Sequence, residues 1–114
     1  MDAKKKEPES RTNRLTIRTC IDEATTDTYN EYEQASGWLC CLEVAFRGIL
    51  KVLFLGEPVR LKQLDVESDV AVVAVVQKGA KTARVSLGSI SLINPSKEQS
   101  IWHRAYLEWS RTGG

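Results

Sequence analysis

The residues best suited to chemistry are three cysteines and one histidine, namely Cys20, Cys40, Cys41 and His103. A zinc site needs about four ligands, usually in paired spacings. Adjacent Cys40 and Cys41 point to different sides of a helix or strand, and His103 is far away in sequence, so this spacing does not match a zinc site. An odd number of thiols suits a reducing compartment better than a disulfide framework. We interpret the cysteines as buried thiols and expect no metal and no cofactor.

A second group with possible chemistry is the acidic pair Asp65 and Asp69. On a turn, two such carboxylates bind a cation only weakly. The surrounding sequence has neither the spacing of an EF-hand nor a dense acidic cluster, so it does not predict a dedicated calcium site. No glycine-rich phosphate loop precedes a helix, and no nucleophile, base and acid form a recognisable local signature. A short chain without these motifs is predicted to be non-enzymatic, with no catalytic residue.

The charge and composition are those of an ordinary globular domain. The 114 residues include 16 Lys and Arg and 15 Asp and Glu, a net charge of +1. A strong electrostatic nucleic-acid binder usually carries a clear basic excess, so this balance argues against one. The apolar runs are far shorter than the roughly 20 residues of a membrane helix, and the lysine-rich start is not a secretory signal. We expect an intracellular protein, in the cytoplasm, the nucleus or both.

The composition along the chain predicts one domain. Residues 1–13 are predicted to form a disordered tail, because they are charged and polar with almost no apolar side chain. Residues 14–111 are predicted to form a single folded domain, and residues 112–114 to fray.

The domain is predicted to begin with a strand and a helix. A short alternation of apolar and polar residues favours a strand over residues 14–21. From about residue 27 to residue 46, apolar residues recur at helical spacing, which favours a helix. Gly37 in the middle costs about 1 kcal/mol relative to alanine, and a strand over residues 38–46 is the alternative.

Short strands are predicted at close intervals in the second half of the chain. Glycine, proline and acidic residues between them are typical of turns, and the predicted strands cover residues 49–55, 59–64, 70–76, 83–87 and 90–93. The unbroken apolar run Val70–Val76 indicates a strand that is buried on both faces. The stretch Asp65–Asp69 is predicted to be a turn, and Gly88 to mark a bulge or bend.

The chain is predicted to end in a helix over residues 96–111. Ser96 and Gln99 match a capping box at its start. One face of this helix carries the aromatic residues Trp102, Tyr106 and Trp109. That face either packs in the core or binds a partner, since aromatic residues are enriched at interface centres.

The order of a helix, short strands and a final helix resembles the Sm and Sm-like fold. Gly56 and Val59 followed by Asp65–Asp69 are similar to the first Sm motif, and Val85–Ile93 is similar to the second. The resemblance covers about residues 28–94. It implies a mainly β fold, a small bent five-stranded barrel with an N-terminal helix and a C-terminal helix.

Departures from the Sm pattern shape the expected function. Asp69 stands where RNA-binding members have asparagine, and Leu87 where they have arginine. Ionised aspartate only accepts hydrogen bonds and leucine makes none, so we expect no tight uridine-specific RNA binding. Sm-like proteins without this pocket include the Gemin members of the SMN complex. The resemblance therefore implies a protein-interaction scaffold in mRNA processing and snRNP assembly.

The alternative is a pleckstrin-homology-like or C2-like adaptor that binds a protein or a membrane lipid. A pleckstrin-homology-like domain also closes a bent barrel with a tryptophan-bearing helix, for which Trp102 would serve. It needs more strands than this sequence predicts. The sequence also lacks a basic cluster on an early hairpin, so membrane-lipid binding is not expected.

Partners are expected at the strand edges, because an unpaired edge presents free N–H and C=O groups. The predicted edges carry few charges, and their candidate interaction residues are Thr82, Arg84, Val85, Leu87, Ile90 and Leu92. Together with the aromatic helix face, they predict a protein partner in a hetero-oligomer held by strand pairing.

Overall fold

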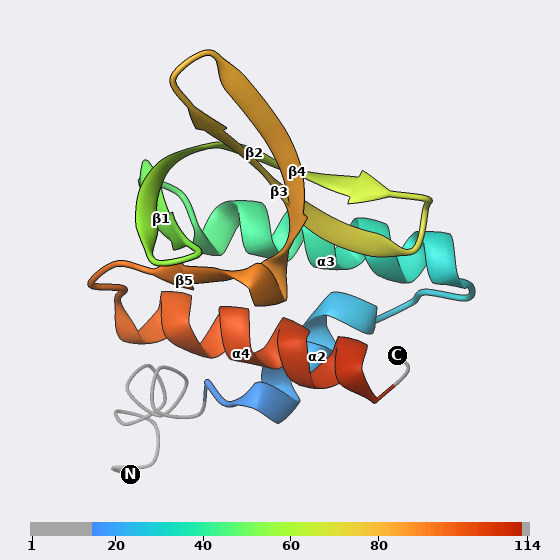
Figure 1. Cartoon of the computed structure of the whole chain (residues 1–114). Helices are drawn as coiled ribbons and strands as arrows, with labels where there is room; N and C mark the ends of the chain where they lie inside the picture. The colour runs from blue at the N-terminus through green and yellow to red at the C-terminus, as the bar shows by residue number, and fades with distance from the viewer. Residues whose placement is uncertain (1–14, 113–114) are drawn as a thin grey trace, which may run out of the picture.

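The computed structural model describes residues 15–112, so the tail predicted over residues 1–13 and the last two residues lie outside it. Three α-helices and a five-stranded antiparallel sheet make up the described part (Figure 1). The elements are α2 (Ile17–Thr25), α3 (Glu31–Ala45), β1 (Lys51–Phe54), β2 (Glu57–Glu67), β3 (Ala71–Lys78), β4 (Lys81–Ser86), the short 3-10 helix η1 (Leu87–Ser89), β5 (Ile90–Leu92) and α4 (Lys97–Arg111).

The sheet has the strand order β4-β3-β2-β1-β5. The first residues of β2 pair with β1 and the rest with β3, and the register shifts between Leu61 and Gln63, which marks a bulge. The long β2 curves strongly, so the β3–β4 hairpin turns back over the sheet (Figure 1). Within residues 15–112, however, β4 pairs only with β3 and β5 only with β1. The mainly β prediction with five strands is confirmed, but the sheet is open, so the closed barrel is wrong.

The first helix, α2, begins at Ile17 and covers residues 17–21 of the strand predicted over residues 14–21, so that prediction is wrong. Thr16 caps the helix: its Oγ1 accepts a hydrogen bond from the Thr19 N–H at 3.2 Å, and Thr19 Oγ1 accepts one from the Thr16 N–H at 2.9 Å. Cys20 and Ala24 lie one helical turn apart, and both are buried. The helical spacing of these small side chains outweighs the short apolar alternation before them.

The other two helices agree with the sequence. The helix predicted over residues 27–46 is α3, which excludes the alternative strand over residues 38–46. At the start of α4, Ser96 Oγ accepts from the Gln99 N–H at 3.0 Å, and Gln99 Oε1 accepts from the Ser96 N–H at 2.9 Å. The predicted capping box is therefore confirmed.

The acidic stretch predicted as a turn is mostly strand. β2 continues through Glu67, and only the next three residues connect it to β3. Ser68 and Asp69 take left-handed backbone angles there, with φ of 55° and 61°. Asp65 and Glu67, two residues apart on one strand, therefore share a face of the sheet.

The core lies between the sheet and the helices. Helix α3 packs on β2 and β3, and α2 and α4 pack on α3. Trp38 of α3 is fully buried and meets Trp102 and Tyr106 of α4 edge to face, with ring centroids 6.0 and 5.3 Å apart. On β3, Val72 is 1% exposed and Val75 8% exposed, so the prediction of a strand buried on both faces is confirmed.

None of the helices in the described part combines the length and the apolar character required to cross a bilayer.

Candidate functional site

The three cysteines differ in burial, and the two covered thiols, Cys20 and Cys41, have raised pKa values. Cys20 is buried, Cys41 is half-buried and Cys40 is exposed, so the buried-thiol interpretation is wrong for Cys40. Burial, with a smaller contribution from Glu23, raises the pKa of the Cys20 thiol to about 12 and that of Cys41 to about 11. Both are protonated at neutral pH, and the thiol is a poor nucleophile and ligand. Across residues 15–112, no three His, Cys, Asp or Glu side chains lie where they could hold a metal ion together.

His103 contacts η1 and the end of α3. Its Nε2 lies 2.8 Å from the carbonyl oxygen of Leu87, and its ring meets Phe46 with centroids 5.9 Å apart. The carbonyl can only accept, so Nε2 carries the hydrogen and donates it. Burial lowers the pKa of His103, and the hydrogen bond to Leu87 opposes this only in part. The imidazole is thus neutral and ties α4 to η1.

This lowered pKa predicts a pH-dependent stability. Because the unfolded chain binds the His103 proton more readily than the folded chain, stability is complete above about pH 6.5 and decreases as the pH falls below it. We expect the urea concentration at the unfolding midpoint to decrease as the pH is lowered from 7.5 to 5. His103→Gln keeps a donor for Leu87 without titrating, so its midpoint should vary less over the same range. An equal decrease in both proteins would contradict the assignment.

Oxygen atoms from the end of β2 converge on the guanidinium of Arg84 from β4. Arg84 Nη1 donates to Asp65 Oδ2 at 3.0 Å, Nε donates to Glu67 Oε1 at 2.8 Å, and Nη2 donates to the Val66 carbonyl at 3.3 Å. Since β3 lies between β2 and β4, the Arg84 side chain crosses β3 to reach them. We call Asp65, the Val66 carbonyl and Glu67 the acidic site.

Electrostatics at the acidic site stabilises the charged forms of Asp65 and Arg84. The hydrogen bond from Arg84, followed by that from the Val66 N–H, lowers the pKa of Asp65. Hydrogen bonds to Glu67 and then Asp65 raise the pKa of Arg84. The side chains are 42% exposed for Arg84, 41% for Asp65 and 51% for Glu67. Water screens ion pairs this exposed, so the guanidinium leaves them at little energetic cost.

Sequence reasoning found only part of the acidic site. It paired Asp65 with Asp69, but the structure brings Asp65 together with Glu67 and leaves Asp69 exposed on the turn. Sequence reasoning assigned Arg84 to an edge that binds a partner, whereas its side chain forms ion pairs with Asp65 and Glu67. An interpretation of residues 65–67 as strand would have put both carboxylates on one face, since side chains alternate along a strand.

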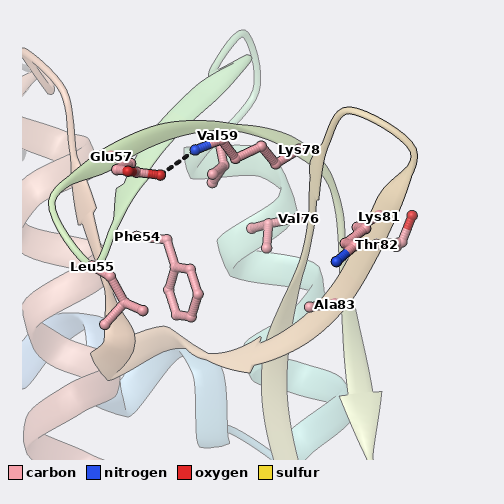
Figure 2. Close-up of a pocket in the computed structure, with 9 residues that line it drawn as sticks. All are labelled: Phe54, Leu55, Glu57, Val59, Val76, Lys78, Lys81, Thr82 and Ala83. Carbon is pink, nitrogen blue, oxygen red and sulfur yellow. Dashed lines mark hydrogen bonds and ion pairs between the residues drawn. The ribbon is translucent and has the colours of Figure 1, made fainter.

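A pocket of about 340 Å³ opens between the β1–β2 turn and the β3–β4 hairpin (Figure 2). Its lining consists of Phe54, Leu55, Glu57, Val59, Val76, Lys78, Lys81, Thr82 and Ala83. Figure 2 shows Phe54 and Val76 inside the ring that the curved strands make. Glu57 and Lys78 form an ion pair at the rim, which lowers the pKa of Glu57. We call this hollow the rim pocket.

The predicted edge residues are divided between surface and core. Thr82 and Arg84 are exposed, and Val85 and Leu92 are half-buried. Leu87 and Ile90 point into the core, with 1% and 4% exposure. Within the described part of the chain, β4 and β5 each have one edge without a strand partner. A protein partner held by strand pairing stays a prediction.

The aromatic face of α4 packs inward. Trp102 is 5% exposed and Tyr106 4% exposed. The Tyr106 hydroxyl accepts a hydrogen bond from the Val72 N–H at 2.9 Å. Trp109 is half-buried and packs against Trp38 with ring centroids 5.5 Å apart. The burial of Trp102 and Tyr106 favours the core-packing alternative for these side chains over partner binding.

Comparison with known proteins identifies the fold. No protein-family model matches the chain, and no curated protein sequence matches it. The crystal structure of CcbP from Anabaena has a TM-score of 0.67 and 16% identity, over 90% of this chain and 89% of that one. A calcium binding protein in its calcium-binding form has a TM-score of 0.67 and 16% identity, over 84% and 92%. At this identity, the likeness shows the fold alone.

These structures overturn the predicted function. The two proteins share the fold over most of their length, one is described as a calcium binding protein, and neither is Sm-like. The prediction of an Sm-like scaffold in mRNA processing and snRNP assembly is therefore wrong. The pleckstrin-homology-like and C2-like alternatives gain no support from them either.

Proposed function

We propose that this chain is a non-enzymatic calcium-binding protein and that the acidic site supplies its calcium ligands. The observation that carries the proposal is the convergence of Asp65, Glu67 and the Val66 carbonyl on one cationic group, the guanidinium of Arg84. The fold likeness to a calcium binding protein supports the choice of ion.

The donor chemistry fits calcium. Ca²⁺ is a hard cation that takes carboxylate and backbone carbonyl oxygens, with water completing its coordination. Two carboxylates and one carbonyl are a small set, and no third acidic, His or Cys side chain of the described residues forms a metal-holding group with them. We therefore expect weak binding, with a Kd of about 10⁻⁴ to 10⁻³ M, since affinity follows the number of charged ligands.

Calcium and Arg84 compete for the same oxygens in this proposal. Arg84 contributes hydrogen bonds to both carboxylates, so it must move away before an ion takes its place. The exchange is feasible because all three side chains are partly exposed and water replaces the hydrogen bonds that are lost. Two further observations support a non-enzymatic role: the thiols of Cys20 and Cys41 are protonated, and His103 is held by a backbone carbonyl.

Because calcium and Arg84 compete for the same oxygens, substitutions of Asp65 and of Arg84 should change the calcium affinity in opposite directions. At constant ionic strength, Asp65→Asn should abolish calcium binding, because it removes a charged ligand. Arg84→Gln should tighten binding several-fold, because it removes the competing cation. The measurement is calorimetric titration with CaCl₂, with amide chemical shifts recorded in parallel to locate the site.

Arg60→Gln is the matched control. Arg60 is an exposed arginine of β2 that pairs with Lys51 and Gln77 in the sheet, away from the acidic site. Arg60→Gln removes one positive charge, as Arg84→Gln does, but far from the proposed ligands. Its calcium affinity should therefore stay at the wild-type value. Binding that survives Asp65→Asn, or that weakens in Arg84→Gln, would refute the acidic site as the calcium site.

A further inference from the structure

We propose that the rim pocket binds a small apolar molecule with a single negative charge, of the medium-chain carboxylate class. This proposal is independent of calcium, because the rim pocket and the acidic site share no residue. The volume of about 340 Å³ lies at the lower end of ligand pockets, which hold about 300–1,000 Å³.

The interior of the rim pocket is apolar and open to solvent. The sheet curvature brings Phe54 from β1, Val76 from β3 and Ala83 from β4 around one hollow, as Figure 2 shows. Phe54 is only half-buried and Ala83 is exposed. An apolar ligand that covered these groups would remove their surface from water, which is the main source of affinity in such pockets.

The conformation of Leu55 is an independent observation. Leu55 and Gly56 form the β1–β2 turn with φ of 55° and 82°, a left-handed pair that favours Asn and Gly. A leucine is strained there, and the residue is 84% exposed at the pocket. A large apolar side chain that is exposed to water, on a residue in a disfavoured backbone conformation, contributes no stabilising burial to the fold. Contact with a ligand in the rim pocket gives it a role.

The charge at the rim selects an anion. Glu57 and Lys78 neutralise one another, whereas Lys81 makes no ion pair with any residue in the described part of the chain. The rim therefore carries one uncompensated positive charge. A carboxylate that reaches Lys81 while its alkyl chain lies against Phe54 and Val76 satisfies both halves of the pocket.

The test compares three probes with the same alkyl chain: decanoate, decanol and decyltrimethylammonium. Each is titrated in EDTA, below its micelle concentration, while amide chemical shifts are recorded. Decanoate should bind most tightly and shift amides of Phe54, Leu55, Val76 and Ala83, decanol should bind more weakly, and the cation should bind least. Equal affinity for all three probes, no binding at millimolar concentration, or shifts elsewhere in the chain would overturn the proposal.

Variants separate the charge from the cavity. Lys81→Gln should weaken the binding of decanoate about tenfold, because one charge-assisted contact is lost. The affinity for decanol should stay unchanged. Lys62→Gln removes a lysine of β2 outside the rim pocket and should change neither. Ala83→Leu fills part of the hollow from an exposed position and should weaken both probes. A dimer that shifts the same amides without any probe would overturn the proposal, because a second copy would then occupy the pocket.

Discussion

Val72→Asp is expected to unfold the protein. Val72 is 1% exposed in the middle of the core, and its N–H is bound by the Tyr106 hydroxyl at 2.9 Å. A carboxylate at that position has no cationic partner in the core, where every buried side chain in the described residues is apolar or aromatic. Burying it costs several kcal/mol, comparable to the ~5–15 kcal/mol that holds a domain of this size together. Circular dichroism should show no cooperative thermal transition.

Val70→Asp is the matched control, because Val70 is 44% exposed on the turn before β3. It introduces the same charge only two residues away, and its melting temperature should stay close to that of the wild type. If Val72→Asp melted like the wild type, β3 would not be the core strand that the structure describes.

Gly37→Ala is expected to destabilise the protein even though alanine is the better helix former. Helix propensity alone predicts a gain of about 1 kcal/mol. A Cβ at this position in α3, however, would overlap with the carbonyl oxygen of Ala24 in α2, so the two helix backbones would have to separate. Overpacking against a rigid backbone costs typically 1–3 kcal/mol or more. Because the overlap is with backbone, we take the upper end of this cost, about 3 kcal/mol, and after the propensity gain of about 1 kcal/mol expect a net loss of about 2 kcal/mol in the free energy of unfolding, measured in urea.

Gly88→Ala provides the comparison for that variant. A Cβ there would lie 3.6 Å from Leu107 Cδ2, an ordinary van der Waals distance. This substitution should leave the free energy of unfolding nearly unchanged. A Gly37→Ala protein as stable as the wild type would show that α2 and α3 are not packed backbone to backbone.

Local sequence patterns determined the elements whose cause is local. The Ser96 capping box needs only neighbouring residues, so it located the start of α4 correctly. The apolar run at residues 70–76 identified β3 as a strand buried on both faces, because few other structures accommodate seven apolar residues in succession. The same logic failed for residues 14–21, where the four-residue alternation over residues 15–18 could not outweigh a capped helix.

Tertiary structure alone decided the features that join distant segments. Arg84 meets Asp65 and Glu67 only because antiparallel register sets β4 beside β3 and β3 beside β2, and an error of one residue would send these side chains to opposite faces. Whether the curved sheet closed, and therefore whether a rim pocket exists, depended on how strongly β2 bends. Gly37 looked like a weak point in a helix, and the contact with α2 makes it a requirement. Local sequence specifies conformation, whereas a site depends on distances between residues far apart in the chain, which packing of the whole chain sets.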